Sequence, residues 1–174
     1  MTSIYLAGGC FWCVESAFLL VKGIEKVTPG YLGGNTKNPN YSQVCTGETG
    51  HAEAIKLNYF EDKISLKNIL DIFFLIHDPT QLNRQGNDIG SQYRSAIFVE
   101  KKEQLKVCKI AISNLKIKLK KNIYTELLEC KNFYPAEEYH HDYYNKNPNS
   151  AYCNISIPPK LDKLKFFFPN FIKS

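Results

Sequence analysis

Residues 4–21 read IYLAGGCFWCVESAFLLV, and this stretch sets the local fold of the N-terminal region. The apolar run Ile4 to Ala7 predicts a short buried strand that ends at Gly8-Gly9. Over residues 14–21, apolar side chains recur at the spacing of one helix face, and Gly23 is a plausible helix stop. We therefore predict a strand, a tight turn and a helix in immediate succession.

Strands and helices alternate along the rest of the chain. We predict strands at residues 24–31, 51–60, 95–99 and around 123–128. We predict helices at residues 65–74, with Ser65 as the cap, and at residues 105–119. Long connections, including a polar loop over 78–94 and a proline-containing C-terminal coil from about residue 147, favour an α+β fold in one domain over residues 1–174.

The bulk composition is ordinary for a soluble globular protein. A net charge of +5 is spread over many lysines and does not predict nucleic-acid binding. The N-terminus has no secretory leader, and no apolar run approaches the roughly 18 residues of a membrane-spanning helix. We expect a cytoplasmic monomer without a membrane anchor. In that compartment its six cysteines would not form a static disulfide framework.

Cys10 lies where the predicted strand gives way to the predicted helix. Unpaired amides and the positive end of the helix dipole at such a position stabilise a thiolate, which is the reactive form of cysteine. Cys13 follows one helical turn later, so the two sulfurs could form a disulfide. Phe11 and Trp12 would place an apolar wall beside Cys10. The segment predicts redox chemistry at Cys10.

A C-x-x-C spacing alone does not distinguish redox from metal chemistry. His51-Ala52-Glu53 matches the H-x-E element of zinc deaminases, in which a P-C-x-x-C element follows. Here the cysteines precede it, and Gly9 replaces the proline. We therefore expect no metal, and we interpret His51 as a hydrogen-bonded structural residue.

Five segments, taken together, resemble the motifs of the A-type peptide methionine sulfoxide reductases. They occur in the family's order and span nearly the whole chain. They are GGCFWCVE (8–15), NPNYSQVC (38–45), TGETGHAE (46–53), HDPTQLNRQGNDIGSQYRS (77–95) and FYPAEEYH (133–140). The resemblance implies a compact two-layer α/β sandwich around a mixed sheet, with a ferredoxin-like core and extensive coil. It also implies the S epimer of methionine sulfoxide, free or in proteins, as substrate, thioredoxin as reductant, and no cofactor.

The resemblance also assigns the catalytic residues. Cys10 is the nucleophile, and Glu53 donates a proton to the sulfoxide oxygen. Tyr41 and Tyr93 hydrogen-bond that oxygen. These roles make chemical sense, because a sulfoxide oxygen is a poor leaving group until it is protonated. A carboxyl among apolar walls keeps its proton at neutral pH, and phenol hydroxyls orient the oxygen without adding charge.

The same resemblance assigns substrate contacts. Phe11 and Trp12 hold the S-methyl group, and Asp88 supports the site and the substrate backbone. An indirect role for Glu137 or Tyr139 near the site stays open.

Recycling of Cys10 requires a second thiol to condense with its sulfenic acid. Many family members carry glycine where this chain has Cys13, and they use C-terminal cysteines instead. This chain has one C-terminal cysteine, Cys153, and lacks the usual partner after it. We favour Cys13 as the resolving thiol, with Cys153 as the alternative or as a relay. The other cysteines are interpreted as structural.

Two other classes of function remain open from sequence. A general thiol–disulfide oxidoreductase could use Cys10-x-x-Cys13 alone, but it would not need Glu53, Tyr41 and Tyr93. A methionine-sulfoxide-binding module without activity would not need an intact Cys10 and Glu53.

Overall fold

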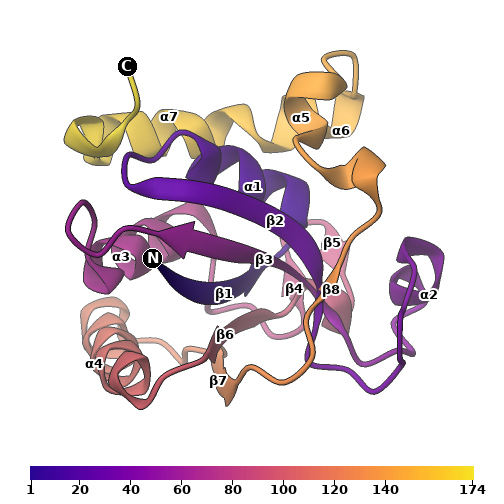
Figure 1. Ribbon diagram of the computed structural model, residues 1–174, viewed down its shortest axis with the longest axis horizontal. Helices are drawn as coiled ribbons and strands as arrows, with labels where there is room; N and C mark the ends of the chain where they lie inside the picture. The colour runs from indigo at the N-terminus through magenta and orange to yellow at the C-terminus, as the bar shows by residue number, and fades with distance from the viewer.

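The computed structural model describes residues 1–174. Strands and helices alternate from β1 to α3, and three helices follow one another at the C-terminal end (Figure 1). In chain order the strands and helices are β1 (Thr2–Gly8), α1 (Phe11–Leu19), β2 (Ile24–Leu32), α2 (Tyr41–Cys45), β3 (Ala52–Tyr59), α3 (Leu66–Ile76), β4 (Arg84–Gln85), β5 (Asp88–Ile89), β6 (Ser95–Val99), α4 (Lys102–Leu119), β7 (Glu126–Glu129), β8 (Tyr134–Pro135), α5 (Tyr143–Lys146), α6 (Ala151–Ser156) and α7 (Pro158–Phe167).

The main sheet has six strands in the order β7-β6-β1-β3-β2-β8. Its four central strands are antiparallel, and they connect as two interleaved β-α-β units, β1-α1-β2 and β3-α3-β6. This arrangement is the ferredoxin-like core that the family resemblance implied. β7 pairs with β6 in parallel, so the sheet is mixed, as expected.

Alternate residues of β1 point to opposite faces of the sheet. Ile4 and Leu6 belong to the main hydrophobic core, which they share with α1 and α3. Tyr5 and Ala7 lie in a smaller cluster on the other face, where Phe133 of the irregular segment after β7 packs on them. One face of the sheet is therefore covered by helices, and much of the other by coil. This is the two-layer arrangement expected.

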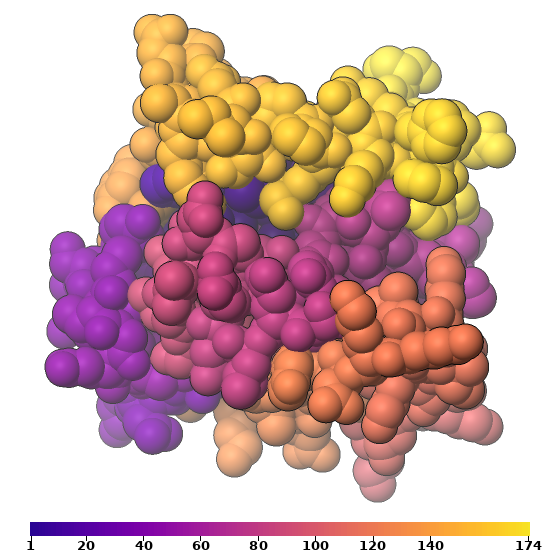
Figure 2. Space-filling view, turned by 180° about the vertical axis from the view of Figure 1, so that it is seen from behind, coloured from indigo at the N-terminus to yellow at the C-terminus, as the bar shows by residue number.

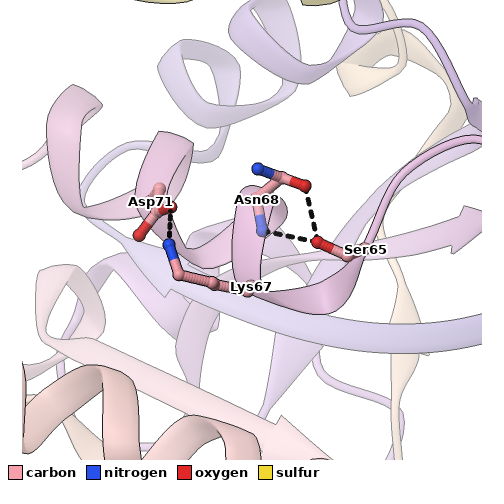
Figure 3. A network of polar contacts seen from close by, with 4 residues as sticks. All are labelled: Ser65, Lys67, Asn68 and Asp71. Atoms are coloured by element: carbon pink, nitrogen blue, oxygen red, sulfur yellow. Dashed lines mark hydrogen bonds and ion pairs between the residues drawn. The ribbon is translucent and has the colours of Figure 1, made fainter.

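α3 begins where the sequence predicted. The Ser65 hydroxyl oxygen accepts a hydrogen bond from the Asn68 amide at 3.1 Å, which satisfies a free N–H of the first turn. On the exposed face of the helix, Lys67 and Asp71 form an ion pair at 2.7 Å (Figure 3). The inner face contributes Phe73 and its neighbours to the core.

The C-terminal region corrects the prediction of coil from residue 147. It contains α6 and α7 instead, and α7 lies beside α1 (Figure 1). Pro158 and Pro159 occupy the first turn of α7, where a missing N–H costs nothing, so these prolines start a helix rather than prevent one. The tail docks on the domain through buried Leu164. No helix is both long and apolar enough to cross a membrane.

Candidate active site

Cys10 lies at the turn between β1 and α1, as the sequence predicted. Gly9 has φ +90°, and a Cβ there would lie 2.7 Å from Cγ of Gln85, so the turn requires glycine. Cys10 is the N-cap of α1, and Phe11 is the first helical residue. The Cys10 side chain is buried, with 7% of its surface exposed. The core therefore holds the sulfur at a fixed place.

Burial changes the protonation expected for Cys10. Loss of hydration raises the pKa of Cys10 well above its ordinary value, and the helix-start amide of Trp12 lowers it by less than burial raises it. The neighbouring Cys10 thiol lowers the pKa of Cys13, and Cys13 raises that of Cys10 further. This corrects the prediction of a preformed thiolate at Cys10. In the resting pair, Cys13 is the more acidic thiol.

Glu53 lies on β3 and reaches the start of α1. Its Oε1 accepts a hydrogen bond from the Phe11 amide at 3.1 Å, while Oε2 has no partner. The side chain is only 2% exposed, and burial raises the pKa of Glu53 to about 8. The carboxyl therefore carries a proton at neutral pH, next to the residue that follows Cys10.

Tyr41 and Tyr93 approach Glu53 from different segments. Tyr41 begins α2, where Asn40 and Gln43 form a capping box. Tyr93 ends a 3₁₀ turn just before β6. Burial, followed by the nearby Glu53 carboxyl, raises the pKa of both phenols. Both hydroxyls therefore stay protonated and can donate hydrogen bonds.

Trp12 forms one wall of a hollow of about 500 Å³, which Tyr41 and Tyr143 also line. The indole stacks on the Tyr143 ring, with centroids 3.8 Å apart and planes inclined by 7°. Its Nε1 donates to Nδ1 of His140 at 3.0 Å. Phe11 is only 1% exposed, and the centroid of its ring lies 6.3 Å from that of the Tyr41 ring. Both predicted wall residues thus belong to one aromatic cluster.

A hollow of about 440 Å³ opens beside the two cysteines. Cys10, Cys13, Asp88, Tyr152 and Lys160 line it. In Figure 2, dark N-terminal atoms are visible in the gap between the C-terminal segment and the pink segment that precedes β6. The Tyr152 hydroxyl donates to the Asp88 carboxylate, which joins α6 to β5 across this opening. Glu53, Tyr41 and Tyr93 do not line this hollow, and Glu53 bonds to the amide of Phe11, the residue that follows Cys10.

Cys153 belongs to the same buried cluster as Cys10 and Cys13. It is fully buried at the start of α6, and Ile157 packs beside it. Burial raises the pKa of Cys153. Both candidate resolving thiols therefore lie close to Cys10, and Cys13 is the one with the lowered pKa.

Glu137, whose indirect role the sequence left open, supports the site, and Tyr31 and His140 are supporting residues that were not assigned from sequence. Tyr31 pairs with Glu53 across the β2–β3 ladder and donates to Glu137 at 2.9 Å. Glu137 also accepts a hydrogen bond from the Tyr41 amide at 3.0 Å, so it holds the backbone of that tyrosine in place. His140 is fully buried beside Trp12. The aromatic, acidic segment 133–144 was the only sequence signal for these contacts.

His51 has the structural role that we predicted. Its Nδ1 accepts from the Gly34 amide at 3.0 Å, and Nε2 lies 2.7 Å from the Thr36 carbonyl oxygen. Both ring nitrogens are therefore engaged by backbone groups.

Comparison with known proteins agrees with this geometry. The family model described as "Peptide methionine sulfoxide reductase" matches residues 2–170. The chain is 53% identical to a peptide methionine sulfoxide reductase MsrA of Trichodesmium erythraeum, over 98% of this chain and 97% of that protein. Reduced Mxr1 from Saccharomyces cerevisiae superposes with a TM-score of 0.83 at 36% identity, covering 90% of this chain and 88% of that one.

A second yeast structure contains a partner. Mxr1 in complex with Trx2 matches with a TM-score of 0.58 at 26% identity, over 81% of this chain and 83% of that one. The family match over nearly the full length, the relative at 53% identity and the shared fold all point the same way. The chain belongs to the peptide methionine sulfoxide reductase family.

Proposed function

We propose that the protein reduces the S epimer of methionine sulfoxide, free or in proteins, by attack of Cys10 on the sulfoxide sulfur. The observation that carries this proposal is the buried Glu53 carboxyl. It is held by the first amide of α1, has one oxygen without a partner, and keeps its proton because burial raises its pKa to about 8. A general acid at this place serves a reaction in which an oxygen must be protonated.

In the first step, the Cys10 sulfur attacks the substrate sulfur while Glu53 protonates the oxygen. An S–S bond forms as the S–O bond breaks, and the oxygen leaves as water with one proton from Glu53 and one from the Cys10 thiol. Water then attacks the Cys10 sulfur, the S–S bond breaks, methionine leaves, and Cys10 becomes a sulfenic acid, while the proton that this water releases restores the Glu53 carboxyl. Tyr41 and Tyr93 orient the oxygen, and the Phe11–Trp12 wall holds the S-methyl group. Asp88, at the edge of the hollow, supports the substrate backbone.

In the second step, Cys13 condenses with the Cys10 sulfenic acid and releases water. Its position in the cysteine cluster and its lowered pKa support this role. Cys153, in the same cluster, can relay the disulfide outward. Thioredoxin then reduces the disulfide, which the complex of the related Mxr1 with Trx2 supports. A reducing compartment such as the cytoplasm supplies that reductant, and we place the protein there as a monomer.

A general thiol–disulfide oxidoreductase is the less favoured function. Such an enzyme could use the Cys10 and Cys13 thiols alone, and it would not need Tyr41 and Tyr93 to orient an oxygen. The family match over residues 2–170 also favours the sulfoxide reductase. A binding module without activity would not need the three clustered cysteines.

The test is a coupled assay with thioredoxin and its reductase, using the pure S and R epimers of methionine sulfoxide. We expect the wild type to reduce the S epimer, and Cys10→Ser to lose this activity. Cys130→Ser is the matched control, because Cys130 lies on the opposite face of the sheet. No reduction of the S epimer by the wild type, or full activity in Cys10→Ser, would contradict the proposal.

A further inference from the structure

Lys160 brings a positive charge to the cysteine cluster from a distant part of the chain. It lies in the first half of α7 and lines the same hollow as Cys10 and Cys13. Ile157, the N-cap of the helix, belongs to the cluster, and Leu161, the residue after Lys160, packs against it. The helix therefore presents Lys160 at the cysteines, although its sequence position is far from both.

The Lys160 ammonium group is held by a hydrogen bond and has no carboxylate partner. Nζ donates to the Ile76 carbonyl oxygen at the end of α3, at 2.8 Å. Neither of the two ion pairs in the chain involves Lys160, so no carboxylate lies within 4.0 Å of it. A half-buried ammonium without a carboxylate partner acts strongly on an acidic group nearby.

We propose that Lys160 is a positioning residue of the recycling step, which holds Cys13 as a thiolate facing the sulfenic acid of Cys10. This inference rests on the proposed role of Cys13 as the resolving thiol. The Cys13 thiolate attacks the sulfenic sulfur, the S–S bond forms and the S–O bond breaks. The Cys13 sulfur is oxidised, the sulfenic sulfur is reduced, and the leaving hydroxide takes up one proton from solvent as water.

Lys160 is a positive charge that acts on Cys13 from α7. The neighbouring Cys10 thiol and then the Lys160 charge lower the pKa of Cys13, whereas burial and the Asp88 carboxylate raise it. The groups that face Cys13 from the neighbouring elements are Cys10 at the start of α1, Glu53 on β3, Asp88 on β5, Tyr152 and Cys153 on α6, and Lys160 on α7. His77 also faces Lys160 and is neutral, because burial lowers its pKa to about 4.

The experiment isolates disulfide formation from methionine release. The sulfenic acid is formed at one pH with one equivalent of methionine-S-sulfoxide, and the sample is then jumped to a range of pH values. Dimedone trapping and mass mapping follow the loss of the Cys10 sulfenic acid and the gain of the Cys10–Cys13 disulfide. The variants are Lys160→Met, Lys160→Arg and, as the matched control on the exposed face of the same helix, Lys163→Met.

In Lys160→Met, we expect the pH midpoint of disulfide formation to rise by about one pH unit, which lowers the thiolate fraction near neutral pH about tenfold. A more basic thiolate is also a better nucleophile, so the net slowing is about three- to fivefold. Above both midpoints the variant should form the disulfide about threefold faster than the wild type. Lys160→Arg should restore the wild-type profile, and Lys163→Met should keep it.

A merely structural role of Lys160 cannot produce this crossing of two rate profiles. An unchanged midpoint in Lys160→Met, with the Cys10–Cys13 disulfide still forming, would overturn the inference and leave the proposed function intact. Absence of a Cys10–Cys13 disulfide in the wild type would overturn both the role of Cys13 and this inference. If Lys160→Met does not fold, the inference is tested by the pH dependence of alkylation of Cys10 and Cys13 in the wild type. We expect Cys13 to react at lower pH than Cys10, and the reverse order would refute the inference.

Discussion

Replacement of Glu53 by glutamine should separate stability from activity as pH rises. The substitution keeps the shape and the acceptor for the Phe11 amide, but it removes the titrating proton. Burial raises the pKa of Glu53 from 4.5 to about 8 in the folded protein. Between these values the unfolded chain has released the proton while the folded protein still binds it. The wild type therefore loses the stability that the Glu53 proton contributes as pH rises through this range, and the variant lacks this loss.

The size of the effect follows from the two pKa values. Each pKa unit corresponds to about 1.4 kcal/mol, so the wild type loses about 1.4 kcal/mol per pH unit between pH 4.5 and 8. The total approaches roughly 5 kcal/mol and levels off above pH 8. The new amide group adds a constant cost of about 1–3 kcal/mol, because Oε2 of Glu53 has no partner for it. The change with pH of the difference in unfolding free energy between the two proteins does not depend on that cost.

The assay is urea unfolding of the wild type and Glu53→Gln at several pH values from about 5 to 9. We expect the difference in free energy of unfolding to shift in favour of the variant across this range. In single-turnover experiments at neutral pH, methionine release by the variant should be at least about 100-fold slower. A stability difference that does not change with pH would refute the raised pKa. An unchanged rate of methionine release would remove Glu53 as the acid.

Four further changes test other parts of the site. Cys13→Ser should still release the first methionine, while thioredoxin-dependent cycling slows sharply in the coupled assay. Cys153→Ser should form the Cys10–Cys13 disulfide at the wild-type rate, and stopped-flow measurement should show slower reduction of that disulfide by thioredoxin. Tyr93→Phe should slow methionine release up to about tenfold in single turnovers, through loss of one hydrogen bond to the oxygen. Gly9→Ala should lower the free energy of unfolding by at least about 1 kcal/mol, because φ is +90° and Gln85 occupies the space.

The fold was predictable where the sequence carries a simple period. The apolar run Ile4 to Ala7 and the helical period after Cys10 predicted the strand–turn–helix unit, and Ser65 marked the start of α3. The C-terminal helices were missed because Pro158 and Pro159 were interpreted as coil residues. Proline excludes a helix only in its interior, and these prolines lie in the first turn of α7.

The site was predictable only in part, because its residues come from distant segments. The family resemblance identified Cys10 and Glu53 as catalytic residues. It did not indicate the pKa of Cys10, which burial raises by more than the helix start lowers it. Local sequence could not reveal how deep Cys10 lies, since tertiary packing determines this. For the same reason, nothing near Lys160 in the sequence indicates that it lines the cysteine hollow.

The most direct test of the central claim is mass mapping of the wild type after one equivalent of methionine-S-sulfoxide. Samples are acid-quenched over the first turnover, the free thiols are alkylated, and released methionine is counted in the same samples. We predict one methionine per chain and loss of the free Cys10 thiol at the same rate, followed by a disulfide that joins Cys10 to Cys13. Chains that have released methionine while Cys10 remains a free thiol would contradict the account.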